Sequence, residues 1–286
     1  MGTDLRPLVP ADAEEVLDLQ FASFGDLERR VGLPASPPPA DRAPGLRRIT
    51  HLATTDPAGA WVALGPDGRI DGAALALVRE GLWGLSLLVV RPGSQSAGLG
   101  SALLTAALAH GDGTRGGIIL ASEDARALRA YSRAGFALRP VVDASGAVKN
   151  RPERPAAVRP IRWPEDTPVV DAASRFVRGA THAPDMPNYL EAGCEVLVHE
   201  RGGWTAHERG RLRILAAHDE AAAVDLLRAV LAAANGEAGV DFIDAANDWA
   251  VRVVLEAGLT LRPSGATMVC GEVGPLAPYL PSGAYL

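Results

Sequence analysis

Apolar and polar positions along the first half of the chain predict helices and strands in turn. Between 11 and 31 the apolar residues recur at helical spacing, whereas the run 82–90 is almost continuously apolar, as in a buried strand. The predicted elements, in chain order, are a helix over 11–31, strands over 61–64, 70–78 and 82–90, a helix over 98–109, a strand over 118–121, a helix over 124–134 and a strand over 136–142. This order predicts an α/β fold with a mixed sheet.

Two proline-rich segments interrupt this pattern. Residues 32–45 predict a surface loop or lid, and residues 148–160 predict a linker. The linker would divide the chain into a first domain over 1–147 and a second domain over 161–286. At 286 residues, the chain has the length of about two domains of ordinary size.

The second half of the chain repeats the first. The run Gly135-Phe136-Ala137-Leu138-Arg139-Pro140 recurs as Gly258-Leu259-Thr260-Leu261-Arg262-Pro263, 123 positions later. At the same offset, the helical pattern of 101–108 falls on that of 224–231. Agreement of two separated segments at one offset favours a duplicated domain over a chance match.

Composition excludes several classes of protein. Hydrophobic residues make up 48% and charged residues 22%, which is typical of a globular chain, and a formal net charge of −6 does not favour a nucleic-acid partner. The two cysteines form no disulfide framework, and the histidines form no HExxH motif, so we expect no metal. No apolar stretch has the length of a membrane span, and the first residues contain no signal sequence. We therefore expect a soluble cytoplasmic protein with no membrane partner.

The candidate chemistry is concentrated in the turn that follows the strand 82–90. Free backbone N–H groups at the start of the next helix predict an anion site, and glycines at 98 and 100 let a ligand approach the main chain closely. The turn is not a Walker A loop, because Leu99-Gly100 stands where Lys-Ser/Thr is required. It is not a dinucleotide fingerprint either, because Leu103 stands where the third glycine is required.

This turn resembles the acetyl-CoA motif of the GNAT N-acetyltransferases, V-x-P-x-x-[QR]-x-x-G-x-[GA], at Val90, Pro92, Gln95, Gly98 and Gly100. The resemblance implies two tandem GNAT-like folds, with acetyl-CoA as co-substrate. It implies that the pantetheine arm pairs with the strand at Leu88 and Val90, as an added strand would. It also implies that the pyrophosphate lies on the main-chain amides of Gln95, Ser96, Ala97, Gly98, Leu99 and Gly100.

A second segment, 124–136, resembles the family pattern N-x-x-A-x-x-x-Y-x-[KR]-x-G-F. Asp124 stands where the family usually has asparagine, and Tyr131 matches the tyrosine that protonates the departing CoA thiolate. The chemistry suits that role, because a phenol with a pKa of about 10 can donate to a thiolate whose thiol has a pKa of roughly 8.5.

The general base is left open by the sequence. Glu80 and Glu123 are the nearest acidic candidates, and water is a third. The segments 21–25 and 121–123 resemble tandem-GNAT aminoglycoside acetyltransferases, and that resemblance implies the terminal carboxylate of Leu286 as a fourth candidate.

The second half keeps the scaffold pattern and loses the motif. At the 123-residue offset, Gln95, Gly98, Gly100 and Tyr131 become His218, Ala221, Ala223 and Val254. Asp219 and Glu220 would repel a pyrophosphate in this turn. We therefore predict that the second domain is degenerate.

Together these features predict an acetyl-CoA-dependent N-acetyltransferase that acts on a primary amine of a small molecule, as a monomer or homodimer. The acceptor pocket would lie between the helix 11–31, the loop 32–45 and the second domain. The alternative is a non-catalytic acyl-CoA-binding or regulatory module. The missing strand carboxylate favours that alternative, whereas Tyr131 beside an intact turn opposes it.

Overall fold

The computed structural model describes residues 4–95 and 98–286. The first half contains β1 (Asp4–Pro7), α1 (Ala13–Arg30), α2 (Ala43–Thr55), β2 (Ala60–Leu64), β3 (Ile70–Arg79), β4 (Leu82–Val90), α3 (Leu99–Ala109), β5 (Gly116–Ala121), α4 (Ala125–Arg133) and β6 (Ala137–Ala147). The second half contains β7 (Val158–Pro160), α5 (Thr167–Arg178), α6 (Met186–Glu191), β8 (Glu195–His199), β9 (Gly203–Glu208), β10 (Arg211–Ala217), α7 (Glu220–Ala232), β11 (Glu237–Asp244), α8 (Asp248–Glu256), β12 (Thr260–Gly271) and β13 (Tyr279–Leu280). The prediction of a mixed α/β fold is confirmed.

Two local expectations need correction or refinement. The sequence predicts a loop over 32–45, whereas α2 begins inside this range at Ala43. Pro44 looks like a helix breaker, but it occupies the first turn of α2, where a missing N–H costs nothing. Residues 158–160, at the end of the predicted linker, form β7 and pair with β8.

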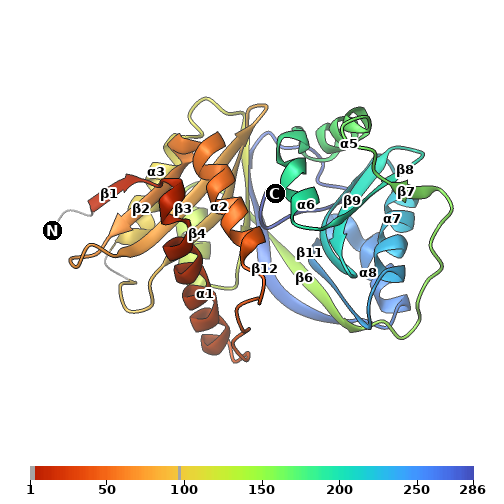
Figure 1. Ribbon diagram of the computed structural model, residues 1–286, viewed down its shortest axis with the longest axis horizontal. Helices are drawn as coiled ribbons and strands as arrows, with labels where there is room; N and C mark the ends of the chain where they lie inside the picture. Colours follow the sequence, from red (N-terminus) through yellow and green to blue (C-terminus); the bar gives the residue numbers. More distant parts are fainter. Residues whose placement is uncertain (1–3, 96–97) are drawn as a thin grey trace.

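Within the described residues, the strands form one 13-stranded sheet, in the order β1-β2-β3-β4-β5-β12-β6-β11-β10-β9-β8-β7, with β13 paired to β10 (Figure 1). The two halves form two lobes, and the long strands β6 and β12 lie side by side between them (Figure 1). The repeat is visible in two of the helices. Helix α4 spans Ala125–Arg133 and α8 spans Asp248–Glu256, so each end of α8 lies 123 residues after the corresponding end of α4.

The two halves exchange their last long strands. Strand β12 of the second half pairs antiparallel with β5 of the first half on one edge and with β6 on the other. Strand β6 of the first half in turn pairs with β11 of the second half. Each half therefore completes its sheet with a strand from the other, and the backbone hydrogen bonds of both strands depend on both halves.

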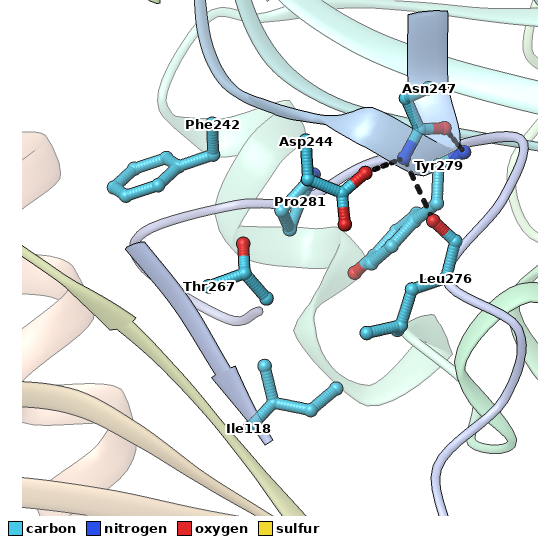
Figure 2. A pocket seen from close by; sticks show the side chains of 8 residues that line it. All are labelled: Ile118, Phe242, Asp244, Asn247, Thr267, Leu276, Tyr279 and Pro281. Atoms are coloured by element: carbon cyan, nitrogen blue, oxygen red, sulfur yellow. Dashed lines mark hydrogen bonds between the residues drawn. The ribbon is translucent and has the colours of Figure 1, made fainter. Parts of the chain in front are cut away.

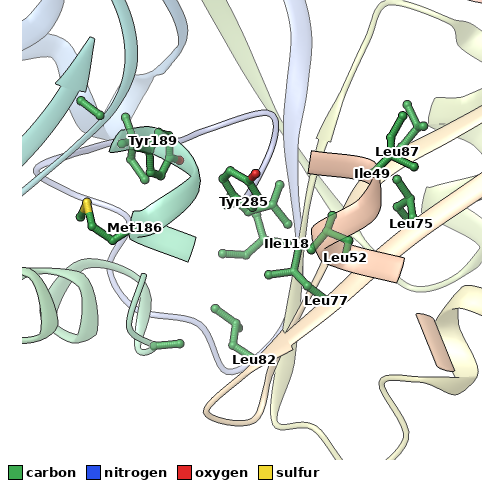
Figure 3. Close-up of a cluster of buried hydrophobic side chains, with 14 of the residues drawn as sticks. Ile49, Leu52, Leu75, Leu77, Leu82, Leu87, Ile118, Met186, Tyr189 and Tyr285 are labelled. Atoms are coloured by element: carbon green, nitrogen blue, oxygen red, sulfur yellow. The ribbon is translucent and has the colours of Figure 1, made fainter. Parts of the chain in front are cut away.

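A continuous apolar core fills the junction. Tyr189 and Tyr285 from the second half pack with Ile49, Leu52 and Leu77 from the first half in one cluster of buried side chains (Figure 3). The junction is thus built as the interior of one domain, with no solvent layer between two surfaces.

A buried ion-pair network crosses the same junction. The guanidinium of Arg79 donates to Asp185 of the second half, at 2.7 and 3.0 Å, and to Asp56 of the first half at 2.9 Å. Asp185 is fully buried, and His51 also contacts its carboxylate, at 2.9 Å. Removing one partner of such a buried pair typically costs about 3–5 kcal/mol, because the other charge is left without compensation.

In the part of the chain that the structure describes, no helix is long and apolar enough to cross a lipid bilayer.

The strand exchange predicts that neither half folds alone. Fragments 1–147 and 148–286, expressed separately, should aggregate or oligomerise, because each lacks the strand that fills its sheet. Co-expressed, they should form a 1:1 complex that unfolds cooperatively. Size-exclusion chromatography with light scattering checks both outcomes, and a folded, monomeric fragment 1–147 would contradict the exchange.

Candidate active site

Strands β4 and β5 separate in the middle of the sheet. They pair in parallel from Leu82 and Gly116 as far as Leu85 and Ile119, and no register pair joins them beyond this point in the described residues. The register of β4 against β3 shifts at the same place, so Ser86 is the extra residue of a bulge. The result is a gap at the carboxyl ends of two parallel strands, where open α/β sheets bind their ligands.

The edge of β4 that faces this gap has no strand partner beyond Leu85 in the described residues. On the other edge, the N–H of Arg91 donates to the carbonyl of Asp71 in β3 at 2.8 Å. Since residues in an antiparallel ladder alternate between the two edges, Val89 also faces β3, whereas Leu88 and Val90 face the gap. The two residues predicted to pair with a pantetheine arm thus present their main chain to the gap.

The turn after β4 is tied to the sheet by Asp71 of β3. Its carboxylate accepts hydrogen bonds from Nε of Arg91 at 2.7 Å and from Oγ of Ser94 at 2.9 Å. Gln95 folds back, and its Nε2 donates to the carbonyl of Val90 at 3.1 Å. These contacts hold the start of the turn against the end of β4.

The end of the turn leads into α3 through a left-handed residue. Gly98 has φ 82° and is the N-cap of α3, and no side chain caps the helix there. The first N–H groups of α3, including those of Leu99 and Gly100, have no partner within the helix and are available to an anion. Ser96 and Ala97, also predicted to contact the pyrophosphate, lie outside the described residues.

A chain of polar contacts joins the turn to α4 and α1. Arg126 donates to Oε1 of Gln95 at 2.6 Å and to the carboxylate of Asp124 at 2.7 Å. Asp124 also accepts the N–H of Arg126, at 2.9 Å, and so caps α4, while Arg30 of α1 reaches it at 3.4 Å. Arg126 lowers the pKa of the Asp124 carboxyl to about 2, so this residue is a charged structural cap.

Tyr131 is part of the core on the α3 side of the sheet. It is the buried residue of α4, and it belongs to the same core cluster as Leu85 and Ile119, the last pair of the β4–β5 ladder. Burial raises the pKa of its phenol above the usual value, and the negative charge of Asp124 adds to this effect. The hydroxyl therefore keeps its proton at neutral pH and can act as a donor.

The three carboxylate candidates for the base that the sequence suggests all contact other groups. Arg175 binds Glu80 through both carboxylate oxygens, at 2.7–3.0 Å, and lowers its pKa. Glu123 pairs with Arg262 at 3.1 Å. The main-chain oxygen of Leu286 is buried against Arg178 and His182.

The corresponding turn of the second half is much shorter, which corrects the ungapped alignment. Between β10 and α7 there are only His218 and Asp219, whereas Arg91–Gly98 lie between β4 and α3. His218 is therefore not the counterpart of Gln95. The carboxylate of Asp219 accepts the N–H of Ala222 at 2.7 Å and caps α7, so the chain supplies its own anion at this helix start.

The gap beside β10 is filled by the chain itself. Strand β13 pairs antiparallel with β10, Leu280 with Leu215 and Tyr279 with Ala216, and the N–H of Ala217 donates to the carbonyl of Pro278 at 3.2 Å. Aligning the ends of β10 and β4 makes Leu215 and Ala217 the counterparts of Leu88 and Val90. The edge that is open in the first half thus carries an added strand in the second.

Asn247 anchors this added strand (Figure 2). Its side chain donates to the carbonyl of Leu276 and accepts the N–H of Tyr279, each at 2.9 Å. The carboxylate of Asp244 accepts a hydrogen bond from Nδ2 of Asn247 at 2.8 Å. A cavity of about 10 Å³ beside these residues has room for one water molecule at most, so no ligand of the size of coenzyme A fits there.

Several contacts at the site escape sequence analysis. Oγ of Ser23, on α1, donates to the carbonyl of Val90 at 3.2 Å, and no motif marks this serine. The contact of Arg126 with Gln95 joins residues from two separate motifs, and its only sequence signal is the Asp124-Ala125-Arg126 spacing of a helix start.

Comparison with known proteins agrees with this geometry. Residues 23–136 match the acetyltransferase (GNAT) family, and no curated protein sequence matches the chain. A putative acetyltransferase from Pyrococcus horikoshii has the same fold, with a TM-score of 0.78, 16% identity, and coverage of 100% of this chain and 96% of that one. A GCN5-related N-acetyltransferase from Sphaerobacter thermophilus gives 0.61 at 15% identity, covering 94% and 95%. A tandem GNAT protein from the clavulanic acid biosynthesis pathway gives 0.58 at 15% identity, covering 94% and 98%.

An open β4 edge, a helix start free to bind an anion and a buried tyrosine on α4 are the features that the sequence predicts for a GNAT-type site. Residues 23–136, in the first half, match the acetyltransferase (GNAT) family, and the similarity of fold to GNAT acetyltransferases extends over both halves. Members of this family are acyltransferases that use acyl-CoA.

The left-handed Gly98 provides a test of the turn. Gly68, in the β2–β3 turn, has φ 79°, and among the described residues an added Cβ at either glycine would meet no atom within 4 Å. Gly98→Ala and Gly68→Ala should each cost roughly 1–2 kcal/mol of stability, as a non-glycine residue does in this conformation. Only Gly98→Ala should also weaken coenzyme A binding, by about tenfold or more. Calorimetric titration and thermal denaturation of both variants measure the difference, and equal affinities would remove the turn from the binding site.

Proposed function

We propose that the first half of this protein is an acetyl-CoA-dependent N-acetyltransferase that transfers the acetyl group to a primary amine of a small molecule. The observation that carries the proposal is the open edge of β4 at Leu88 and Val90. The uncapped start of α3 follows this edge in the chain, and Tyr131 belongs to the core cluster that contains Leu85, at the end of the β4–β5 ladder. A pantetheine arm resembles an extended peptide and can pair with such an edge as β13 pairs with β10.

The reaction follows from these positions. The neutral amine attacks the thioester carbonyl carbon, and the tetrahedral intermediate collapses with cleavage of the C–S bond. The Tyr131 phenol donates a hydrogen bond to the departing sulfur and supplies its proton, because burial keeps that proton on oxygen until negative charge develops nearby. The amine proton leaves to water, since Glu80 and Glu123 are paired with arginines.

Tyr131→Phe tests the acid. Loss of a general acid typically lowers the rate 10²–10⁴-fold. We expect kcat to fall within that range while the affinity for acetyl-CoA stays nearly unchanged. Steady-state kinetics together with calorimetric titration separate the two parameters, and an unchanged kcat with a true acceptor would exclude Tyr131 from the mechanism. Retention of acetyl-CoA with no product from any amine would favour the alternative of a binding module.

The second half should bind no acetyl-CoA. Its turn contains only His218 and Asp219, the Asp219 carboxylate occupies the helix start, and β13 covers the strand edge. Calorimetric titration of the intact chain should therefore give one acetyl-CoA per chain. A stoichiometry of two would contradict this assignment.

A further inference from the structure

Arg48 lies on α2, where α1 and the C-terminal segment meet. Its Nη2 donates to Oε1 of Gln20 on α1. Tyr285, in the C-terminal segment, is close enough to influence its charge, and it packs edge-on against His51, one turn further along α2. Arg48 therefore lines the region where both halves of the chain meet α1.

This guanidinium has no carboxylate partner among the described residues. Its Nε is buried with no hydrogen-bond partner in that part of the chain, and the amide of Gln20 is neutral. Nε of the neighbouring Arg47 is likewise buried without a partner there, but Arg47 has a carboxylate partner, Glu191, at 2.8 Å. Arg42, at the start of the same helix, pairs with two carboxylates.

The other charges at this junction are already compensated. Arg79 is matched by Asp56 and Asp185, and His51 also contacts Asp185. None of these groups is free to neutralise Arg48. Burial lowers the pKa of Arg48, and only Tyr285 opposes the effect. Arg48 is partly buried, and a bound anion would supply the opposite charge that the described residues do not.

Arg48 also lies on the side from which an acceptor would approach. Gln20, its partner, precedes Ser23 by one helical turn, and Ser23 contacts the carbonyl of Val90 at the gap. On the same face of the sheet, the side chain of Leu286 covers Gly84 of β4. The opposite face is covered by α3 and by Tyr131 of α4, so an acceptor on the side of Arg48 would lie on the other face of the sheet from Tyr131.

We propose that Arg48 binds a carboxylate group of the acceptor, so that the acceptor is a primary amine that also carries a carboxylate, such as an amino acid. This inference rests on the proposed function and narrows its substrate class. An arginine presents two N–H groups in the geometry of a carboxylate, and a hydrogen bond to a charged group contributes about 1.5–3 kcal/mol.

The test uses pairs of amines that differ only in the carboxylate: lysine with cadaverine, and tyrosine with tyramine. With wild-type protein and acetyl-CoA, at least one amino acid should have a kcat/KM about 10- to 100-fold above that of its decarboxylated partner. Arg48→Gln should remove this preference by lowering only the value for the amino acid.

Arg47→Gln is the matched control, since it removes a charge from the next position of the same helix and breaks only the contact with Glu191. It should leave the preference intact. Both variants should retain their thermal stability, because Arg48 has no ion pair to lose and the ion pair of Arg47 is partly exposed.

A second measurement separates this inference from the proposed function. Calorimetric titration of the same four amines into the protein saturated with coenzyme A reports binding without turnover. Equal binding of both members of every pair, or binding unaffected by Arg48→Gln, overturns the role of Arg48. Binding of an amino acid that depends on Arg48, with no acetylated product, supports the role of Arg48 and overturns the N-acetyltransferase proposal.

Discussion

The exchange of β6 and β12 is the constraint on which the rest of the structure depends. Both strands use both edges for pairing across the two halves, so the sheet is continuous from β1 to β7. The relative position of the halves is consequently set by main-chain hydrogen bonds, and the shared core and the Arg79 network then form at a predetermined place. Residues of both halves, Gln20 and Tyr285, lie near Arg48, so the exchange also fixes the surroundings of this side chain.

The two halves show one scaffold used in two ways. In each half, two parallel strands, β4 and β5 or β10 and β11, separate toward their carboxyl ends, and a helix starts after the first strand of the pair. In the first half, Leu88 and Val90 present an open edge and Gly98 leads into an uncapped helix. In the second half, β13 occupies the edge and Asp219 occupies the helix start. In the second half, the strand edge and the helix start that could bind a peptide-like arm and a phosphate are therefore occupied by the chain itself.

Much of this arrangement follows from local patterns. The strand predicted over 82–90 has the limits of β4, and the helices predicted over 98–109 and 124–134 agree with α3 and α4 to within a residue at each end. The family pattern also identified the turn before α3 and Tyr131, the buried residue of α4. Helix α2 escaped prediction because Pro44 signals a break to any local rule, although it is favourable in a first turn.

Features that depend on the tertiary structure could not be predicted. A strand pattern specifies which face is apolar but not which partner it pairs with, so the exchange of β6 and β12 leaves no trace in the sequence. The two residues of β13 are too few to show alternation of polar and apolar residues. The shortened turn at His218 cannot be recognised either, because the segments after it keep the 123-residue offset. The lack of a carboxylate partner for Arg48 among the described residues depends on the tertiary positions of the surrounding carboxylates, which no spacing along one helix reveals.

The exchanged strands also bear on how such a chain can evolve. Once the two copies of a duplicated domain have exchanged strands, deletion of either copy would remove part of the sheet of the remaining copy. Mutations that abolish ligand binding in one copy are tolerated, whereas mutations that remove its strand are not. Selection would then preserve the second half as a scaffold long after its own catalytic role was lost, and would leave its loops free to be remodelled around the substrate of the first half.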